Sequence, residues 1–164
     1  MISEYEFNDF RNNLEQLTKK GYALIKGNPF AFLSINFSSR PFYGNIDKNK
    51  FTITQNANMY PIPYLIKGTF KKKGNQTEIS YEIIQMRFAY HWFRIFPLIA
   101  NVMGLICIIS NLEIINSKVL TFVEILFILL IFESILFAPI FINKIKKRKF
   151  EKEFIKRMKI IIPQ

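Results

Sequence analysis

The hydrophobic and polar positions divide the chain into a front part with short apolar runs and a rear part with two long ones. Near the start, Phe7, Phe10, Leu14 and Leu17 are three or four residues apart, the spacing of one helix face. We predict an amphipathic helix over residues 4–20. Its apolar stripe either packs on the domain that follows or lies on a membrane surface. The mixed charges of the opposite face favour packing.

The ends of this helix have their own signals. Ser3 and Glu6 have the spacing of a capping box, in which each side chain satisfies a backbone N–H group of the first turn. Lys19 and Lys20 suit the negative end of the helix dipole, and Gly21 suits a left-handed stop.

Residues 22–86 have the period of β-strands. Short aromatic and β-branched runs are separated by residues typical of turns. With the first helix, they predict an α+β cytoplasmic domain over residues 1–92, with about five mainly antiparallel strands. The predicted strands cover residues 22–25, 30–37, 51–54, 64–70 and 77–84.

The last two runs predict a β-hairpin. Ile79, Tyr81 and Ile83 alternate with polar residues, the mark of a strand with one buried face. The lysine-rich segment 71–76 is expected to form a longer loop between the two strands.

Two apolar runs follow. Residues 95–112 carry no charge and residues 119–142 carry two, whereas a membrane core needs about 20 helical residues. A chain of this size has too little protein to cover two such helices on all sides. We predict transmembrane spans at about 95–115 and 119–142, and the short connection makes residues 93–142 an antiparallel hairpin. Pro97 is expected in the first turn of the first span, where its missing N–H costs little.

The basic residues predict the orientation of this hairpin. Residues 143–149 contain five basic side chains and the connection at 113–118 contains one, so the positive-inside rule places both termini in the cytoplasm, at a plasma (inner) membrane. Nucleic acid or anionic headgroups are the possible partners of the basic segment, and its place beside a span favours lipid. Those predicted to bind headgroups are Lys144, Lys146, Lys147, Arg148 and Lys149.

Residues 143–164 form a basic tail in this scheme. Phe150, Phe154, Met158 and Ile161 repeat at helical spacing, with basic residues between them. This helix either lies on the inner leaflet or folds back on the sheet domain, and an apolar stripe alone does not name its partner. At the other end of the hairpin, Trp92 and Arg94 are predicted interface anchors. His91 is interpreted as an interface residue rather than a ligand or proton shuttle.

Polar residues inside the predicted spans are the candidate functional residues. Acidic side chains there are costly and mark ion paths, proton relays or helix contacts. Counted at about 1.5 Å per residue, Glu133 lies near the midplane, level with Gly104 and one turn from Asn101. We expect Asn101 to hydrogen-bond Glu133, with Gly104 allowing close helix approach. Glu124, level with Ser110, points to the opposite face, because nine residues at about 100° each make a half-turn.

No phosphate-binding loop, metal-binding cluster or catalytic constellation stands out in the sequence. We therefore expect neither a cofactor nor catalysis. The leading interpretation is a two-pass membrane protein that presents a small domain for partner binding, scaffolding or regulation. The alternative is a subunit of an oligomeric ion or proton pathway that uses Glu133. Either a second copy of the chain or another membrane protein is a possible partner, and nucleic acid is not expected.

Overall fold

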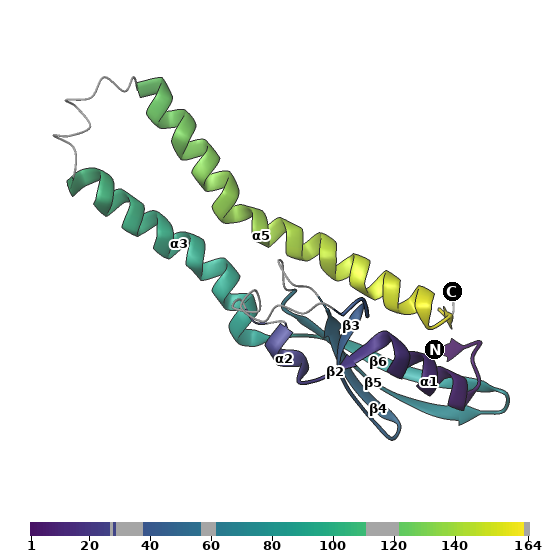
Figure 1. The fold of residues 1–164 in the computed structure, drawn as a ribbon. Helices are drawn as coiled ribbons and strands as arrows, with labels where there is room; N and C mark the ends of the chain where they lie inside the picture. The colour runs from purple at the N-terminus through teal and green to yellow at the C-terminus, as the bar shows by residue number, and fades with distance from the viewer. Residues whose placement is uncertain (27, 29–37, 57–61, 111–121, 163–164) are drawn as a thin grey trace.

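One mixed seven-stranded sheet forms the body of the protein, and two long apolar helices project from it (Figure 1). The computed structural model describes residues 1–26, 28, 38–56, 62–110 and 122–162. The strands are β1 (Ile2–Ser3), β2 (Thr18–Lys20), β3 (Phe42–Asp47), β4 (Lys50–Gln55), β5 (Tyr64–Lys73), β6 (Gln76–Gln85) and β7 (Ile160–Ile161). The helices are α1 (Phe7–Leu17), α2 (Ala23–Lys26), α3 (Arg87–Ser110) and α5 (Phe122–Arg157).

The strand order is β2-β3-β4-β5-β6-β1-β7. Among the strands that the structure describes, only the β2–β3 pair is parallel, and β1 pairs with both β6 and β7. The predicted α+β class and the mainly antiparallel pairing are confirmed, but the prediction of about five strands was too low. Strands β1, β2 and β7 are only two or three residues long, too short to show an alternating pattern.

The hairpin of β5 and β6 is present, but its predicted longer loop is not. Lys73 pairs with Gln76, so the strands run through the lysine run and only Gly74 and Asn75 lie between them. Gly74 has a φ of +62°, which glycine adopts without steric cost. The exposed lysines lie at the tip of this hairpin, where no core has to cover them.

Helix α1 is shorter than predicted, because residues on both sides of it join the sheet. The capping box is absent: Glu6 is the N-cap residue and makes no side-chain cap. The Ser3 hydroxyl instead donates to the Met158 carbonyl oxygen over 2.6 Å and accepts from the Tyr5 amide over 3.2 Å. Tertiary pairing of β1 therefore outweighs the local capping signal. The apolar stripe of α1 packs on the sheet, as favoured, with Phe10 and Leu14 fully buried.

Two further strand predictions have different outcomes. Residues 22–25, expected as a strand, lie in or beside the short helix α2. The predicted strand at 30–37 falls outside the residues that the structure describes. Strand β3 was not predicted, because Gly44 interrupts its alternation. A Cβ atom at Gly44 would collide with the carbonyl oxygen of Thr52, so glycine allows β3 and β4 to approach.

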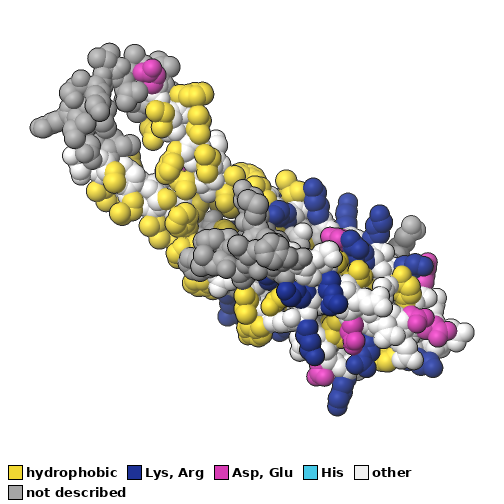
Figure 2. Space-filling model, viewed as in Figure 1, with side chains coloured by type: hydrophobic (Ala, Val, Ile, Leu, Met, Phe, Trp, Pro, Cys, Tyr) yellow, Lys and Arg dark blue, Asp and Glu magenta, His cyan; other side chains and the backbone are white. Residues whose placement is uncertain are grey.

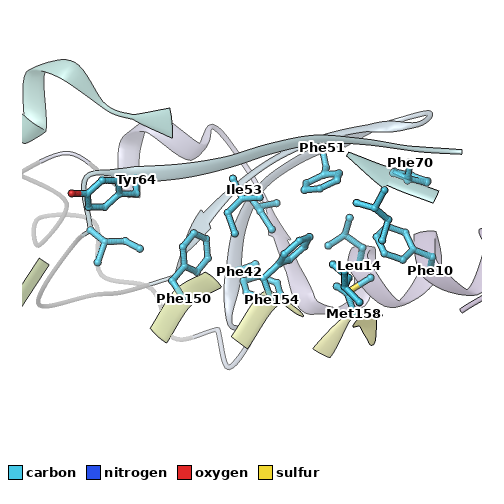
Figure 3. Packing of buried hydrophobic residues seen from close by; sticks show 14 residues of the cluster. Phe10, Leu14, Phe42, Phe51, Ile53, Tyr64, Phe70, Phe150, Phe154 and Met158 are labelled. Atoms are coloured by element: carbon cyan, nitrogen blue, oxygen red, sulfur yellow. The ribbon is translucent and has the colours of Figure 1, made fainter. Parts of the chain in front are cut away.

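The core lies between one face of the sheet and two helices, α1 and the end of α5 (Figure 3). The Phe42 ring lies 6.0 Å from the ring of Phe150 and 6.1 Å from that of Phe154. The Phe154 ring also lies 5.5 Å from Phe51 and 5.4 Å from Tyr81. Of the two possibilities for the tail, the structure shows the fold-back on the sheet. The sheet domain thus contains two segments of chain, one before the long helices and one after them.

A polar contact joins the same two segments. The Tyr81 hydroxyl donates to Glu151 Oε1 over 3.4 Å. Burial, followed by the charge of Glu151 and this hydrogen bond, raises the pKa of Tyr81 to about 12. The phenol therefore stays neutral at physiological pH and remains a hydrogen-bond donor.

The two long helices differ from the predicted spans at their ends toward the sheet. Helix α3 begins at Arg87, so Pro97 lies inside it rather than in its first turn. Helix α5 runs past Pro139 and through the basic segment to Arg157 without interruption. Figure 1 shows that α5 bends along its length, as expected when an interior proline removes a backbone hydrogen bond. In each helix only 6% of the most apolar stretch is buried.

We expect Phe154→Ala to destabilise the sheet domain by about 3–5 kcal/mol, because it leaves a cavity among three aromatic rings. The matched control is Lys156→Ala, which removes an exposed side chain from the same helix. Hydrogen exchange of the β4–β6 amides in the detergent-solubilised full chain measures the difference. Equal protection in both variants would mean that the last turns of α5 do not complete the core.

Candidate functional site

Asn101 and Glu133 face each other between α3 and α5. The Asn101 amide nitrogen donates to Glu133 Oε2 over 3.2 Å. Both side chains are half-buried and line a cavity of about 500 Å³ between the helices. The rest of its wall is apolar, with Leu105, Leu129 and Phe132 among the contributors. We call this space the helix-pair cavity.

Gly104 lies on the wall of the same cavity but does not bring the helices together. A Cβ atom built at Gly104 would meet nothing within 4 Å. The expectation that it permits close helix approach is therefore wrong. Its lack of a side chain instead leaves space beside Asn101 and Glu133.

Glu124 and Ser110, the second polar pair predicted from depth, are both exposed. Depth counting placed them at one level, but level alone does not determine which face a side chain occupies. Glu124 is nine residues from Glu133, and a helix turns by about half a turn over that interval. The structure therefore brings Asn101 and Glu133 together, and it does not bury Glu124 in the helix-pair cavity.

Aromatic and basic side chains gather at the start of α3. The Trp92 ring stacks on Phe96 at 5.7 Å, and the Arg94 guanidinium lies 4.1 Å from the centre of the Tyr90 ring. His91 is exposed and touches the Tyr90 ring edge-on at 5.7 Å. Amphipathic rings and an arginine at this position are typical of a membrane–water interface.

The five predicted headgroup-binding residues occupy different sides of α5. Lys144 and Lys147 line a second cavity, of about 460 Å³, where α3 and α5 join the sheet domain. We call it the junction cavity. Arg148 and Lys149 are exposed and do not line it, and Lys146 is half-buried elsewhere on the helix.

The residues of the junction cavity that were not singled out from the sequence include three polar ones: Tyr64, Tyr90 and Asn143. Tyr64 and Tyr90 come from β5 and α3, and only the fold brings their rings within 6.3 Å. Burial and the neighbouring Tyr90 raise the pKa of Tyr64, while Arg94 opposes the shift. Asn143 had a signal, because it is the first polar residue after the second apolar run.

The described residues contain no group of three or more histidine, cysteine or acidic side chains that could hold a metal ion. Cys107 is exposed on α3. The described residues therefore offer two chemical features, the hydrogen bond at Glu133 and the basic side chains that line the junction cavity.

Comparison with protein-family models, with curated proteins and with solved structures finds no match to this chain.

Proposed function

We propose that this chain is a two-pass integral membrane protein that holds a non-catalytic α+β domain at the membrane surface for binding, scaffolding or regulating a partner. Its two long helices support membrane insertion. Their apolar side chains face outward: Leu98, Ile109, Ile135 and Phe141 are between 59% and 69% exposed. Figure 2 shows hydrophobic side chains covering the helical arm and charged ones covering the domain. Water is a poor solvent for such an arm, and hydrocarbon is a good one.

The fold supports an even number of crossings. Residues before α3 and the last turns of α5 share one core, so both segments belong to the same compartment. Five basic residues at 143–149, against one at 113–118, favour the cytoplasm for that compartment.

The open face of the sheet is the observation that carries the partner-binding role. Alternation along the strands places polar side chains on the face opposite α1 and α5, and α2 covers the part of this face where Leu65 is buried against Ala23. Thr52, Lys67, Ser80 and Glu82 line a shallow groove of about 530 Å³ there. A face with hydroxyls and both signs of charge suits a polar, exchangeable protein contact more than a permanent apolar interface.

Single cysteines, placed in a Cys107→Ser background, test the topology. Cysteine at Ser117 should react with an impermeant thiol reagent added to intact cells. Cysteine at Asn75 should react only after permeabilisation, because the charge asymmetry keeps the domain inside. Labelling of Asn75→Cys in intact cells would contradict the proposed orientation, and equal labelling of both would contradict the crossing itself.

A photo-crosslinking residue at Ser80 tests the partner-binding face in native membranes. We expect one or a few discrete adducts at Ser80, weakened by Glu82→Gln on the same face. The control position is Lys156, exposed on α5, where we expect none. The whole chain is needed, because a fragment ending at residue 92 lacks the core contacts of Phe150 and Phe154. Identical adduct patterns at both positions would count against this face.

A second candidate function is an oligomeric ion or proton pathway. The observation that favours it is the Glu133 carboxyl, hydrogen-bonded to Asn101 beside the helix-pair cavity. A carboxyl at that depth is a functional candidate by default. Lining a pore with two-helix chains would require several copies.

Glu133→Gln separates the two candidates. Gln has the shape of Glu and can both donate and accept hydrogen bonds, but its amide cannot release a proton as a carboxyl group can. With a structural Glu133, we expect unchanged assembly and unchanged cellular function, and Glu133→Leu should loosen the helix pair by only about 0.6 kcal/mol. Proton flux into liposomes is measured in parallel. Normal assembly with a flux that depends on Glu133 would replace the scaffold proposal with the pathway.

A further inference from the structure

The junction cavity collects positive charge without a protein counter-charge. Arg94, Lys144 and Lys147 reach it from α3 and α5. In the part of the chain that the structure describes, no carboxylate lines this cavity and none of the three cations forms an ion pair. Three like charges around one space repel one another, and an anion between them would reverse the sign of that interaction.

Aromatic faces hold two of these cations in place. The Arg94 guanidinium lies over the Tyr90 ring at 4.1 Å, and Lys147 Nζ lies 5.3 Å from the Tyr64 ring centre. The two rings are themselves in edge-on contact at 6.3 Å. Cation–π contacts leave N–H groups available for an acceptor, whereas carboxylate partners would occupy them.

Asn143 adds a neutral donor to the same cavity. The residue is 8% exposed and lines the cavity. Its side-chain amide carries N–H groups that can donate to an oxygen of a ligand bound there. The cavity therefore offers three cations and an amide to one group of acceptors.

The depth of the cavity matches that of lipid phosphates. Lys144 lies eleven residues along α5 from Glu133, which is about 16 Å of helix. Half the thickness of a hydrocarbon core is about 15 Å. With Glu133 near the midplane, Lys144 and Arg94 lie where the headgroups begin.

The apolar part of the cavity continues onto the outside of the helices. Phe93, Ile140 and Phe141 share its wall with the cations, and Phe141 is 69% exposed. A ligand with a phosphate and an acyl chain can contact both parts at once. A free inorganic ion can use only the polar part.

We propose that the junction cavity is a specific site for an anionic phospholipid, whose phosphate is bound by Arg94, Asn143, Lys144 and Lys147. Its acyl chains run along Phe93 and Phe141 toward the membrane interior. The proposal deepens the proposed function, because it rests on insertion of the two helices. It also gives Lys144 and Lys147, two of the five basic residues at 143–149, a specific role that differs from general attraction to an anionic surface.

Native mass spectrometry of the detergent-purified full chain, titrated with phosphatidylglycerol, tests the site. Lys144→Gln with Lys147→Gln should weaken binding of the first lipid by about tenfold or more. The control pair, Arg148→Gln with Lys149→Gln, removes the same charge outside the cavity and should change it by less than about threefold. Asn143→Leu keeps the charge and should also weaken binding. Circular dichroism checks that each variant folds.

Phosphatidylcholine and inorganic phosphate complete the measurement. We expect phosphatidylcholine to bind more weakly than phosphatidylglycerol, and inorganic phosphate not to displace the bound lipid. An equal loss of lipid affinity in the Lys144/Lys147 and Arg148/Lys149 double variants would mean that only diffuse electrostatic attraction acts. That result would overturn the proposal. Full displacement by inorganic phosphate would instead show a free-anion site. Binding in detergent does not depend on crossing a bilayer, so failure here is distinct from a failed topology experiment.

Discussion

The packing of the last turns of α5 against the sheet is the interaction on which the rest of the structure depends. Phe150 and Phe154 contact Phe42, and β7 pairs with β1 at the edge of the same sheet. These contacts connect chain segments separated by the two long helices. Aromatic burial of this size outweighs the modest entropy of closing a longer loop. Both ends of the helical arm are consequently fixed to one body.

This connection determines the order in which the parts can become stable. Residues of the first segment supply most of the sheet, but α1 covers only part of its inner face. The remaining cover comes from a segment made after both long helices. The sheet therefore gains its full core only once the second helix has brought residues 150–160 back to it. In a membrane, insertion and completion of the domain are coupled events, because mislocating one helix would keep the two segments apart.

The sequence predicted those features that repeat over several residues. The stripe of Phe10 and Leu14 and the alternation around Ile79 are periodic signals, and the two apolar runs are recognised by their length and lack of basic residues. Depth counting also placed Asn101 beside Glu133, because an antiparallel pair with a short connection has a nearly fixed register. The sequence could not predict features that depend on contacts between residues far apart in the chain. Strands of two residues are too short to show a period. Ser3 does not cap α1, because its hydroxyl donates to the Met158 carbonyl oxygen instead. The tyrosines of the junction cavity belong to elements that meet only in the fold.

The geometry around Glu133 bears on the choice between the two proposed functions. A proton path through one hairpin needs successive titratable groups that share a face, yet Glu124 and Glu133 point about half a turn apart on α5. Glu133 accepts a hydrogen bond from the side-chain amide of Asn101. An amide can position a carboxyl group, but it does not ionise and so cannot pass a proton on. Among the described residues, the remaining wall of the helix-pair cavity carries no titratable side chain. In a single copy of the chain, Asn101 and Glu133 therefore form a hydrogen-bonded contact between two helices. The sheet domain, by contrast, presents its open polar face without needing a second copy. The same chain thus supports an anchored binding domain more directly than it supports a conduction path.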